Sequence, residues 1–374
     1  MLPVFKIGLI RMSYQIPVMR PSLPKYADVE PLLRSIDMTR IYSNRGPLIR
    51  ALESEYAEYL GTKPELVVAV ANATLGLQGL LEISRTFDWY VPDYTFAATG
   101  LAVIKSNKVL HLCDVGAENW KLQISELQNN SNDIGVLPVI PFGASVDFLE
   151  YLTFKNVIID AAASLGRTPP DFSKMHPEWS VVYSLHATKV LGAGEGAIVV
   201  CGKEETAEEL RSWINFGFNS ERTAEICGTN AKMSEFNAAY GLTSLRTFYM
   251  SQKDWIDSQT LVAEYGKERP WMTWVNSSPA FQPYWIIDLE DSFRKIHIEK
   301  TLNAFGIQSR SWWAKPLSKQ NAFKSCNRFG NLNISNDLAL RHLGLPMFPG
   351  LSENEVRYIV SAIDQGLLAY KEKI

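Results

Sequence analysis

Residues 180–200, SVVYSLHATKVLGAGEGAIVV, decide how the rest of the chain is interpreted. An apolar run at the start of this stretch and another at 197–200 predict two strands, because β-branched residues favour buried, pleated positions. Between the runs lie Lys189 and glycines that let backbone approach a ligand closely. A lysine in such a loop suits covalent bonding to a cofactor carbonyl, although a solvated loop lysine is the commoner case.

A second stretch upstream, residues 156–166, reads NVIIDAAASLG. Its apolar strand ends at Asp160 and is followed by small residues. This pattern predicts that Asp160 lies at the carboxyl edge of a buried sheet, where open α/β folds bind their ligands. Asp160 and Lys189 therefore form a predicted acid–amine pair at neighbouring strand ends.

Six blocks of sequence, in order along the chain, carry a resemblance to a known family. They are SNRGPLIRALESEYAEYLG from Ser43, VAVANATLGL from Val68, VPDYTFAATGLAV from Val91, VIIDAAASLG from Val157, SLHATKVLGAGEGA from Ser184 and GTNAKMSEFNAAYGLTSL from Gly228. Together they resemble the sugar aminotransferases of the DegT/DnrJ/EryC1/StrS family, and weaker similarity continues to the C-terminus. The resemblance implies the fold type I of the pyridoxal 5′-phosphate (PLP)-dependent transferases, in the aspartate aminotransferase superfamily.

The order of elements predicts the fold class. Alternating strands and helices favour an α/β protein with a mostly parallel sheet covered on both faces. The resemblance implies a large PLP-binding domain at 12–248, with a mostly parallel seven-stranded sheet flanked by helices, and a smaller α/β C-terminal domain at 249–374. Residues 1–11 are interpreted as a disordered extension or a start-site artefact.

Local patterns predict individual elements. Apolar residues recur every four positions between Pro47 and Gly61, which predicts a helix at 47–60. In the C-terminal domain, strands are predicted near 271–275, 283–289 and 309–312, and helices at 293–305 and 353–370.

Composition restricts the classes of partner. With 374 residues and a formal net charge of −3, the chain has no electrostatic footprint for nucleic acid or an anionic membrane. Its four cysteines are widely spaced and form no CxxC pair, so neither a metal site nor a disulfide framework is indicated, and the cytoplasm fits. The opening MLPVFKIGLIRM is too short for a signal sequence or a membrane span. Small-molecule partners are favoured.

The resemblance assigns the cofactor-binding residues. Lys189 would form the internal aldimine with PLP and serve as general acid and base, Asp160 would hold the pyridine nitrogen protonated, and Phe96 would stack on the ring. The phosphate ligands would be Ala73, Thr74, Ser184 and Asn230, the last reaching across a homodimer interface into the neighbouring active site. Taken alone, the same positions also fit a simple helix cap by Asn72 or Thr74, a core aromatic at Phe96 and a helix-capping Asn230.

Two positions depart from the family pattern. Pro141 stands where relatives often carry a histidine, and Ala163 stands where they typically carry glutamine or histidine near the cofactor's phenolic oxygen. Either Ser164 or a water could take the place of the missing side chain. These departures are the features that favour a non-catalytic regulatory relative with a decayed site.

Candidates for substrate contact come from two segments. His186 and Glu195 flank Lys189 in its loop, and Arg310 and Trp312 lie in a segment where relatives bring an arginine and aromatics to the active site. A structural histidine, and an interface or core role for the tryptophans, are equally compatible. The loop at 216–225 corresponds to a lid in relatives.

The identity of residue 189 separates two activities within the resemblance, because dehydratase members carry histidine there. Lys189 favours a transaminase that aminates a nucleotide-linked keto-deoxy sugar by a ping-pong mechanism, with glutamate or glutamine as donor and pyridoxamine 5′-phosphate as the intermediate form. By the same resemblance, such amino sugars are components of O-antigens, other polysaccharides or antibiotics. The alternatives are an aminotransferase for a cyclitol or another keto substrate, and another PLP reaction such as a lyase or decarboxylase.

Overall fold

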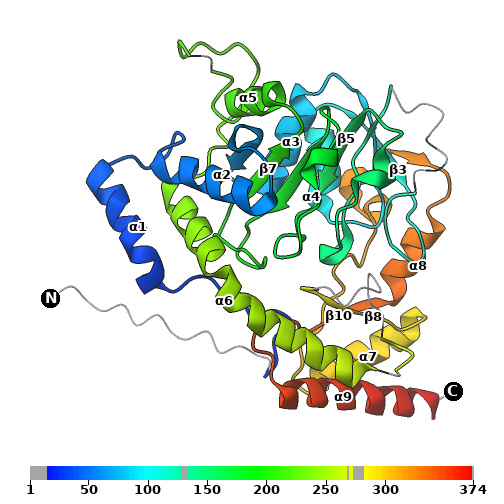
Figure 1. Ribbon diagram of the computed structural model, residues 1–374. Helices are drawn as coiled ribbons and strands as arrows, with labels where there is room; N and C mark the ends of the chain where they lie inside the picture. Colours follow the sequence, from blue (N-terminus) through cyan, green and yellow to red (C-terminus); the bar gives the residue numbers. More distant parts are fainter. Residues whose placement is uncertain are drawn as a thin grey trace.

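A mixed sheet forms the centre of the fold (Figure 1). The computed structural model describes residues 15–123, 125, 127, 133–218, 220–267, 269–272 and 282–372. In this part of the chain the sheet has eight strands in the order β1-β7-β6-β5-β4-β2-β3-β9. The strands are β1 (Val67–Val70), β2 (Asp88–Pro92), β3 (Val109–Cys113), β4 (Gly135–Val136), β5 (Asn156–Asp160), β6 (Ser180–Ser184), β7 (Ala197–Cys201) and β9 (Asn327–Phe329).

The directions of the strands decide which residues share an edge of the sheet. Only β7 runs antiparallel to its neighbours, β1 and β6, whereas the pairs from β6 to β9 are parallel. The carboxyl ends of β1, β2, β5 and β6 therefore lie at one edge. Val70 and Ser184 both pair with Ala197, so these two strand ends are level.

The predicted α/β class and mostly parallel sheet are confirmed, and the described part of residues 12–248 contributes the seven predicted strands, β1 to β7. The additional strand is β9, which pairs in parallel with β3 at the outer edge. Its sequence, NRF, is three residues long, with two exposed residues and one partly buried residue, so it carries no strand pattern of its own. Tertiary pairing with His111, Leu112 and Cys113 makes it a strand.

Helices cover both faces of the sheet, as the alternating side chains of a strand require. Val67 and Ala69 of β1 join one hydrophobic cluster, and Val68 and Val70 join the other. The first cluster packs under α2 (Pro47–Leu60) and α6 (Glu235–Gly266), and α1 (Tyr26–Thr39) packs on α6. The second packs under α3 (Ala73–Ile83), α4 (Ala97–Lys105) and α5 (Glu204–Trp213).

Helix α2 begins and ends at the predicted residues. Pro47 occupies its first turn, and Gly61 ends it in the left-handed region at φ 69°, where glycine is favoured. The buried carboxylate of Glu235 accepts hydrogen bonds from the backbone N–H groups of Leu48 at 2.7 Å and Ile49 at 3.1 Å. This long-range cap ties α2 to the start of α6.

The C-terminal part is built on a two-stranded antiparallel sheet of β8 (Trp285–Asp288) and β10 (His342–Leu345). Around it lie α7 (Ser292–Ala304), α8 (Asn333–Arg341) and α9 (Glu353–Lys371). The predicted strand at 309–312 is wrong, because this segment forms only a single bridge between Arg310 and Gly344. The predicted strand at 271–275 lies mostly outside the described residues.

The long helix α6 joins the two parts of the molecule, running from beside α2 to α9 in Figure 1. It passes without interruption through the predicted domain boundary at 248/249, so the division into domains 12–248 and 249–374 stays a prediction. The predicted extension at residues 1–11 lies outside the described residues.

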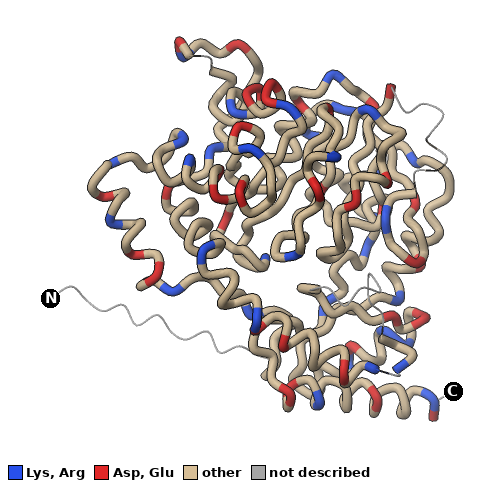
Figure 2. The backbone as a smooth tube through the Cα atoms, in the orientation of Figure 1, with Lys and Arg blue, Asp and Glu red and all other residues tan. Residues whose placement is uncertain are grey.

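Charged residues of both signs are interspersed along the chain in Figure 2. None of the helices in the described ranges combines the length and the apolar character that crossing a membrane demands.

Candidate active site

The carboxyl edge of the sheet collects the predicted cofactor-binding residues. Asp160 ends β5, Ser184 ends β6, and Lys189 lies in the loop that follows. Ala73 and Thr74 begin α3 beyond the end of β1, and Phe96 precedes α4 beyond the end of β2. The parallel arrangement of β1, β2, β5 and β6 is what brings these distant segments to one edge.

Asp160 is a buried carboxylate with defined partners and 6% exposure. Its Oδ2 accepts a hydrogen bond from Thr99 Oγ1 at 2.8 Å, and its Oδ1 accepts one from the backbone N–H of Ala162 at 3.1 Å. Burial raises the pKa of Asp160, and the two hydrogen bonds and the positive charge of Lys189 oppose that rise. Asp160 and Lys189 therefore lie at the same edge of the sheet, near enough for the lysine charge to influence the pKa of Asp160.

Lys189 is half buried, and its amine has one side-chain hydrogen-bond partner among the described residues. Its Nζ donates a hydrogen bond to Tyr284 Oη at 3.0 Å, while its backbone N–H donates to the carbonyl of His186 at 2.8 Å. Tyr284 directly precedes β8 and is 9% exposed. A residue from the C-terminal part of the chain thus positions the amine of a loop on the central sheet.

An aromatic wall formed by Tyr94, Phe142, Tyr284, Trp312 and Trp313 stands beside Lys189. Phe142 stacks on Trp313 with ring centroids 4.1 Å apart and meets Tyr284 edge-on at 5.7 Å. Tyr284 meets Trp312 edge-on at 5.4 Å, and Tyr94 meets Trp313 edge-on at 4.9 Å. Such offset and edge-on contacts are the favoured arrangements of aromatic rings. The wall extends from the segment after β2 to the segment after α7.

Phe142 has a strained backbone at the centre of this wall. Its φ of 48° places a non-glycine residue in the left-handed region, which costs about 1–2 kcal/mol. The buried ring, held between Trp313 and Tyr284, offsets that strain. Trp312 also depends on its neighbour Gly344, because a Cβ there would lie 2.2 Å from Trp312 Nε1.

The N-terminus of α3 can bind an anion. Asn72 is its N-cap and accepts a hydrogen bond from the backbone N–H of Leu75 at 2.9 Å. The N–H groups of Ala73 and Thr74 belong to the first turn, where no intrahelical acceptor exists, and the helix dipole favours a negative charge there. Ser184, whose strand end is level with the end of β1, accepts the N–H of His186 on its Oγ at 3.2 Å, so its own proton is available for donation.

Two of the alternatives that the sequence allows are wrong. Phe96 is 64% exposed at the N-cap of α4, so it is not a core aromatic. Asn230 is exposed and does not cap α6, whose N-cap Ser234 accepts a hydrogen bond from the N–H of Asn237. Both side chains are free to contact something outside the single chain.

The predicted substrate residues His186, Glu195 and Arg310 have other side-chain partners. His186 Nδ1 lies 2.8 Å from Thr188 Oγ1, and its Nε2 lies 3.7 Å from Glu195 Oε1, an exposed pair. The Arg310 guanidinium lies 4.8 Å from the ring centroid of Trp312. Of the four candidates for substrate contact, His186 accepts the backbone N–H of Lys189 on its carbonyl, and the Trp312 ring contacts Tyr284, the hydrogen-bond partner of Lys189 Nζ.

The two departures from the family pattern are placed differently. Pro141 starts a short 3₁₀ turn, Pro141–Gly143, that carries Phe142 into the aromatic wall. Ser164 Oγ is buried and lines a separate cavity with Arg167 and Tyr183, whereas Lys189 lines another hollow with Arg20 and Phe348. The hydroxyl that meets the amine is that of Tyr284, and the group that takes the place of the family's side chain at Ala163 stays a prediction.

Sequence reasoning missed Thr99 and Tyr284. Thr99 lies three residues after Phe96, on the first turn of α4, and this spacing on one helix face was a usable signal. Tyr284 lies 95 residues from Lys189, and nothing local predicts that contact.

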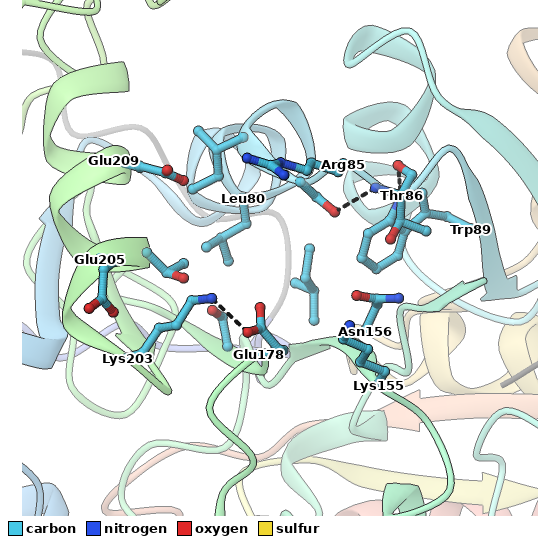
Figure 3. Close-up of a pocket in the computed structure, with 15 residues that line it drawn as sticks. Leu80, Arg85, Thr86, Trp89, Lys155, Asn156, Glu178, Lys203, Glu205 and Glu209 are labelled. Atoms are coloured by element: carbon cyan, nitrogen blue, oxygen red, sulfur yellow. Dashed lines mark hydrogen bonds and ion pairs between the residues drawn. The ribbon is translucent and has the colours of Figure 1, made fainter. Parts of the chain in front are cut away.

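A polar pocket of about 430 Å³ lies at the opposite edge of the sheet (Figure 3). It is lined by Trp89, Asn156 and Ser180, which are at the amino ends of their strands, and by Glu178 and Lys203, which form an ion pair at 2.6 Å. None of the predicted site residues lines it.

Two solved structures share this architecture over nearly their whole length. A putative PLP-dependent aminotransferase from Bacillus cereus superposes with a TM-score of 0.83 and 25% identity, covering 94% of this chain and all of that one. DesI in the presence of its TDP-sugar product gives a TM-score of 0.83 and 25% identity, covering 96% of each chain. The protein is thus a transferase of the PLP-dependent fold type I.

The sequence assigns the family. The DegT/DnrJ/EryC1/StrS aminotransferase family matches residues 27–364, so the chain belongs to this family and is an aminotransferase. The dTDP-4-amino-4,6-dideoxy-D-glucose transaminase of Shigella dysenteriae is 26% identical over 94% of this chain and 99% of its own length. The predicted resemblance is confirmed, and membership in the family implies PLP dependence.

Proposed function

We propose that this aminotransferase uses PLP to transfer an amino group from glutamate or glutamine to a nucleotide-linked keto sugar. The observation that carries the proposal is the convergence of Lys189 and buried Asp160 at one edge of the sheet. The substrate class is supported by the Shigella transaminase and by DesI, whose descriptions name dTDP- and TDP-linked sugars.

The residues of the site fit PLP. A buried carboxylate whose pKa is raised by desolvation is stabilised when a cationic ring nitrogen lies beside it. The α3 N-terminus and Ser184 supply donors for a phosphate, and exposed Phe96 supplies a flat face for a ring. PLP, when bound, supplies a carbonyl for covalent capture of amines and a conjugated cation that accepts electrons from the substrate Cα.

The chain's own groups would then divide the work. Lys189 Nζ would take the proton from Cα of the amino donor and return a proton to the new C–N carbon of the sugar. Tyr284 Oη would hold that amine in position, and Thr99 would hold Asp160. The aromatic wall would exclude water from one side of the amine.

The proposed active unit is a homodimer with shared sites. Asn230 and Phe96 are exposed in the single chain, as a phosphate ligand for a neighbouring site and a ring-stacking residue would be before assembly. Dimer-dependent cofactor affinity would support this arrangement, and a fully active monomer would contradict it.

Absorbance tests the proposal directly. Purified protein with one equivalent of PLP should develop a visible absorption band that disappears on addition of glutamate or glutamine and returns with a nucleotide-linked keto sugar. A cyclitol ketone offered in place of the sugar tests the alternative substrate class. If PLP is never retained, or if the band survives both donors, the site does not perform this reaction.

A further inference from the structure

A second polar site is lined by the segment that follows Asp160. Ser164, Arg167 and Tyr183 line a small cavity together with Tyr59 and Val146. The three polar side chains are 7%, 6% and 2% exposed. The volume open to the centre of a water molecule is about 10 Å³. The cavity therefore holds one water molecule or one ion of similar size.

Arg167 is a buried cation without a counter-ion in the described chain. Its Nη1 donates a hydrogen bond to the carbonyl of Gly143 at 2.7 Å. Its Nε and Nη2 are buried, and no partner for them occurs among the residues that the structure describes. Burial lowers the pKa of Arg167, and no carboxylate in the described ranges forms an ion pair with it. A buried charge left in this state is expensive.

Two hydroxyl groups in the same cavity also lack a hydrogen-bond partner in the part of the chain that the structure describes. Ser164 Oγ and Tyr183 Oη are buried, and neither has a hydrogen-bond partner within the described ranges. Each can donate a proton, as can Arg167 Nε and Nη2. The cavity is therefore lined by hydrogen-bond donors and one positive charge. An acceptor that carries negative charge would satisfy both.

We propose that this cavity is a binding site for a small inorganic anion, with chloride as the occupant. A single water would fill the space and satisfy donors, but it would leave the guanidinium charge uncompensated. Phosphate or a carboxylate ligand requires more room than the cavity leaves. The bound anion would neutralise Arg167, which in turn holds Gly143 beside Phe142. The proposal does not depend on the proposed function.

Bromide identifies the occupant. Crystals of the PLP-loaded protein would be soaked in sodium bromide, and anomalous differences would be measured at the bromine absorption edge. The expected result is a peak within hydrogen-bond distance of Arg167 Nη2 and Tyr183 Oη. A peak-free cavity holding only water, or an acidic side chain of a second copy seated on Arg167, would overturn the proposal.

Chloride titration tests the same site in solution. At constant ionic strength, replacing gluconate by chloride should raise the unfolding midpoint of the PLP-loaded protein by about 2 °C in a saturable way. Arg167→Met and Ser164→Ala should abolish or weaken that response. If Arg167→Met does not fold, Ser164→Ala alone decides the outcome, because a full response there contradicts the site.

Arg211→Met is the matched control. Arg211 is also partly buried and donates to the carbonyls of Glu65 and Val67, but Glu53 and Glu208 lie near enough to influence its pKa. Its loss should lower the unfolding midpoint and leave the chloride response intact. If both arginine variants lose the response equally, chloride acts elsewhere and the proposal fails.

Discussion

The two edges of the central sheet carry similar residue types with opposite consequences. At the amino edge, the Lys203–Glu178 pair is 34% and 37% exposed, and solvent screens its charges (Figure 3). At the carboxyl edge, Asp160 is buried, its pKa is raised, and Lys189 and Thr99 both act on it. The number of charged groups therefore does not identify the active site. The burial of Asp160 and the position of Lys189 and Thr99 beside it identify the active site.

The largest effect is expected from Lys189→Ala. The variant should fold normally and lose turnover by at least about 10⁴-fold, since it removes both the covalent anchor and the proton carrier. Steady-state rates with saturating amino donor, together with the unfolding midpoint, would check this. Turnover near that of the wild type would mean that the carboxyl edge is not the active site.

Asp160→Asn should have the next largest effect on activity, about 10²-fold, because it removes a preorganised charge beside the cofactor. The substitution should also change how the free energy of unfolding depends on pH. A raised pKa means that the folded protein holds a proton that the unfolded chain has released, so this contribution is present at low pH and is lost as the pH rises through the raised pKa of Asp160.

The pH dependence of stability checks this sign. Urea unfolding of the cofactor-free protein between about pH 4 and pH 7 should show a contribution that declines in the wild type and is missing in Asp160→Asn. Parallel pH profiles for the two proteins would contradict the raised pKa. Lys203→Gln at the opposite edge serves as a control that leaves the profile unchanged.

Tyr284→Phe should slow turnover by about tenfold, since a hydrogen bond to a charged group is worth about 1.5–3 kcal/mol and part of it is recovered through water. The ring contacts with Phe142 and Trp312 survive, so the fold should not change. The useful measurement is the rate of the half-reaction with the amino donor, compared with the unfolding midpoint. A merely structural tyrosine would change the midpoint and leave that rate in place.

Glu178→Gln should have the smallest effect. It breaks the ion pair with Lys203 in the pocket of Figure 3, which we expect to change the unfolding free energy by about 0.5 kcal/mol or less and turnover not at all. Urea unfolding and steady-state kinetics would test both. A marked loss of activity would make the amino edge functional and remove the contrast between the two edges.

Elements that depend on interactions between residues close in sequence were predictable, and elements that depend on long-range contacts were not. The helix at 47–60 was predicted at its observed bounds because Pro47, Gly61 and the apolar spacing act locally. Strand β9 and the single bridge at Arg310 were not, because short exposed segments take their structure from what they pair with. Asp160 was identified as a candidate because a polar residue at the end of an apolar strand has a defined place in a parallel sheet, and Lys189 because it lies between two strand-like runs and is followed by glycines.

The sequence by itself determined the α/β class, the family, and the candidate acid–amine pair, because these depend on residue type, order and local periodicity. Only the tertiary structure decided that Tyr284 meets Lys189, that Thr99 holds Asp160, and that Ser164 turns toward Arg167 instead of the amine. Side chains that are distant along the chain are brought together by packing of the whole chain, and no local pattern encodes which of them will touch.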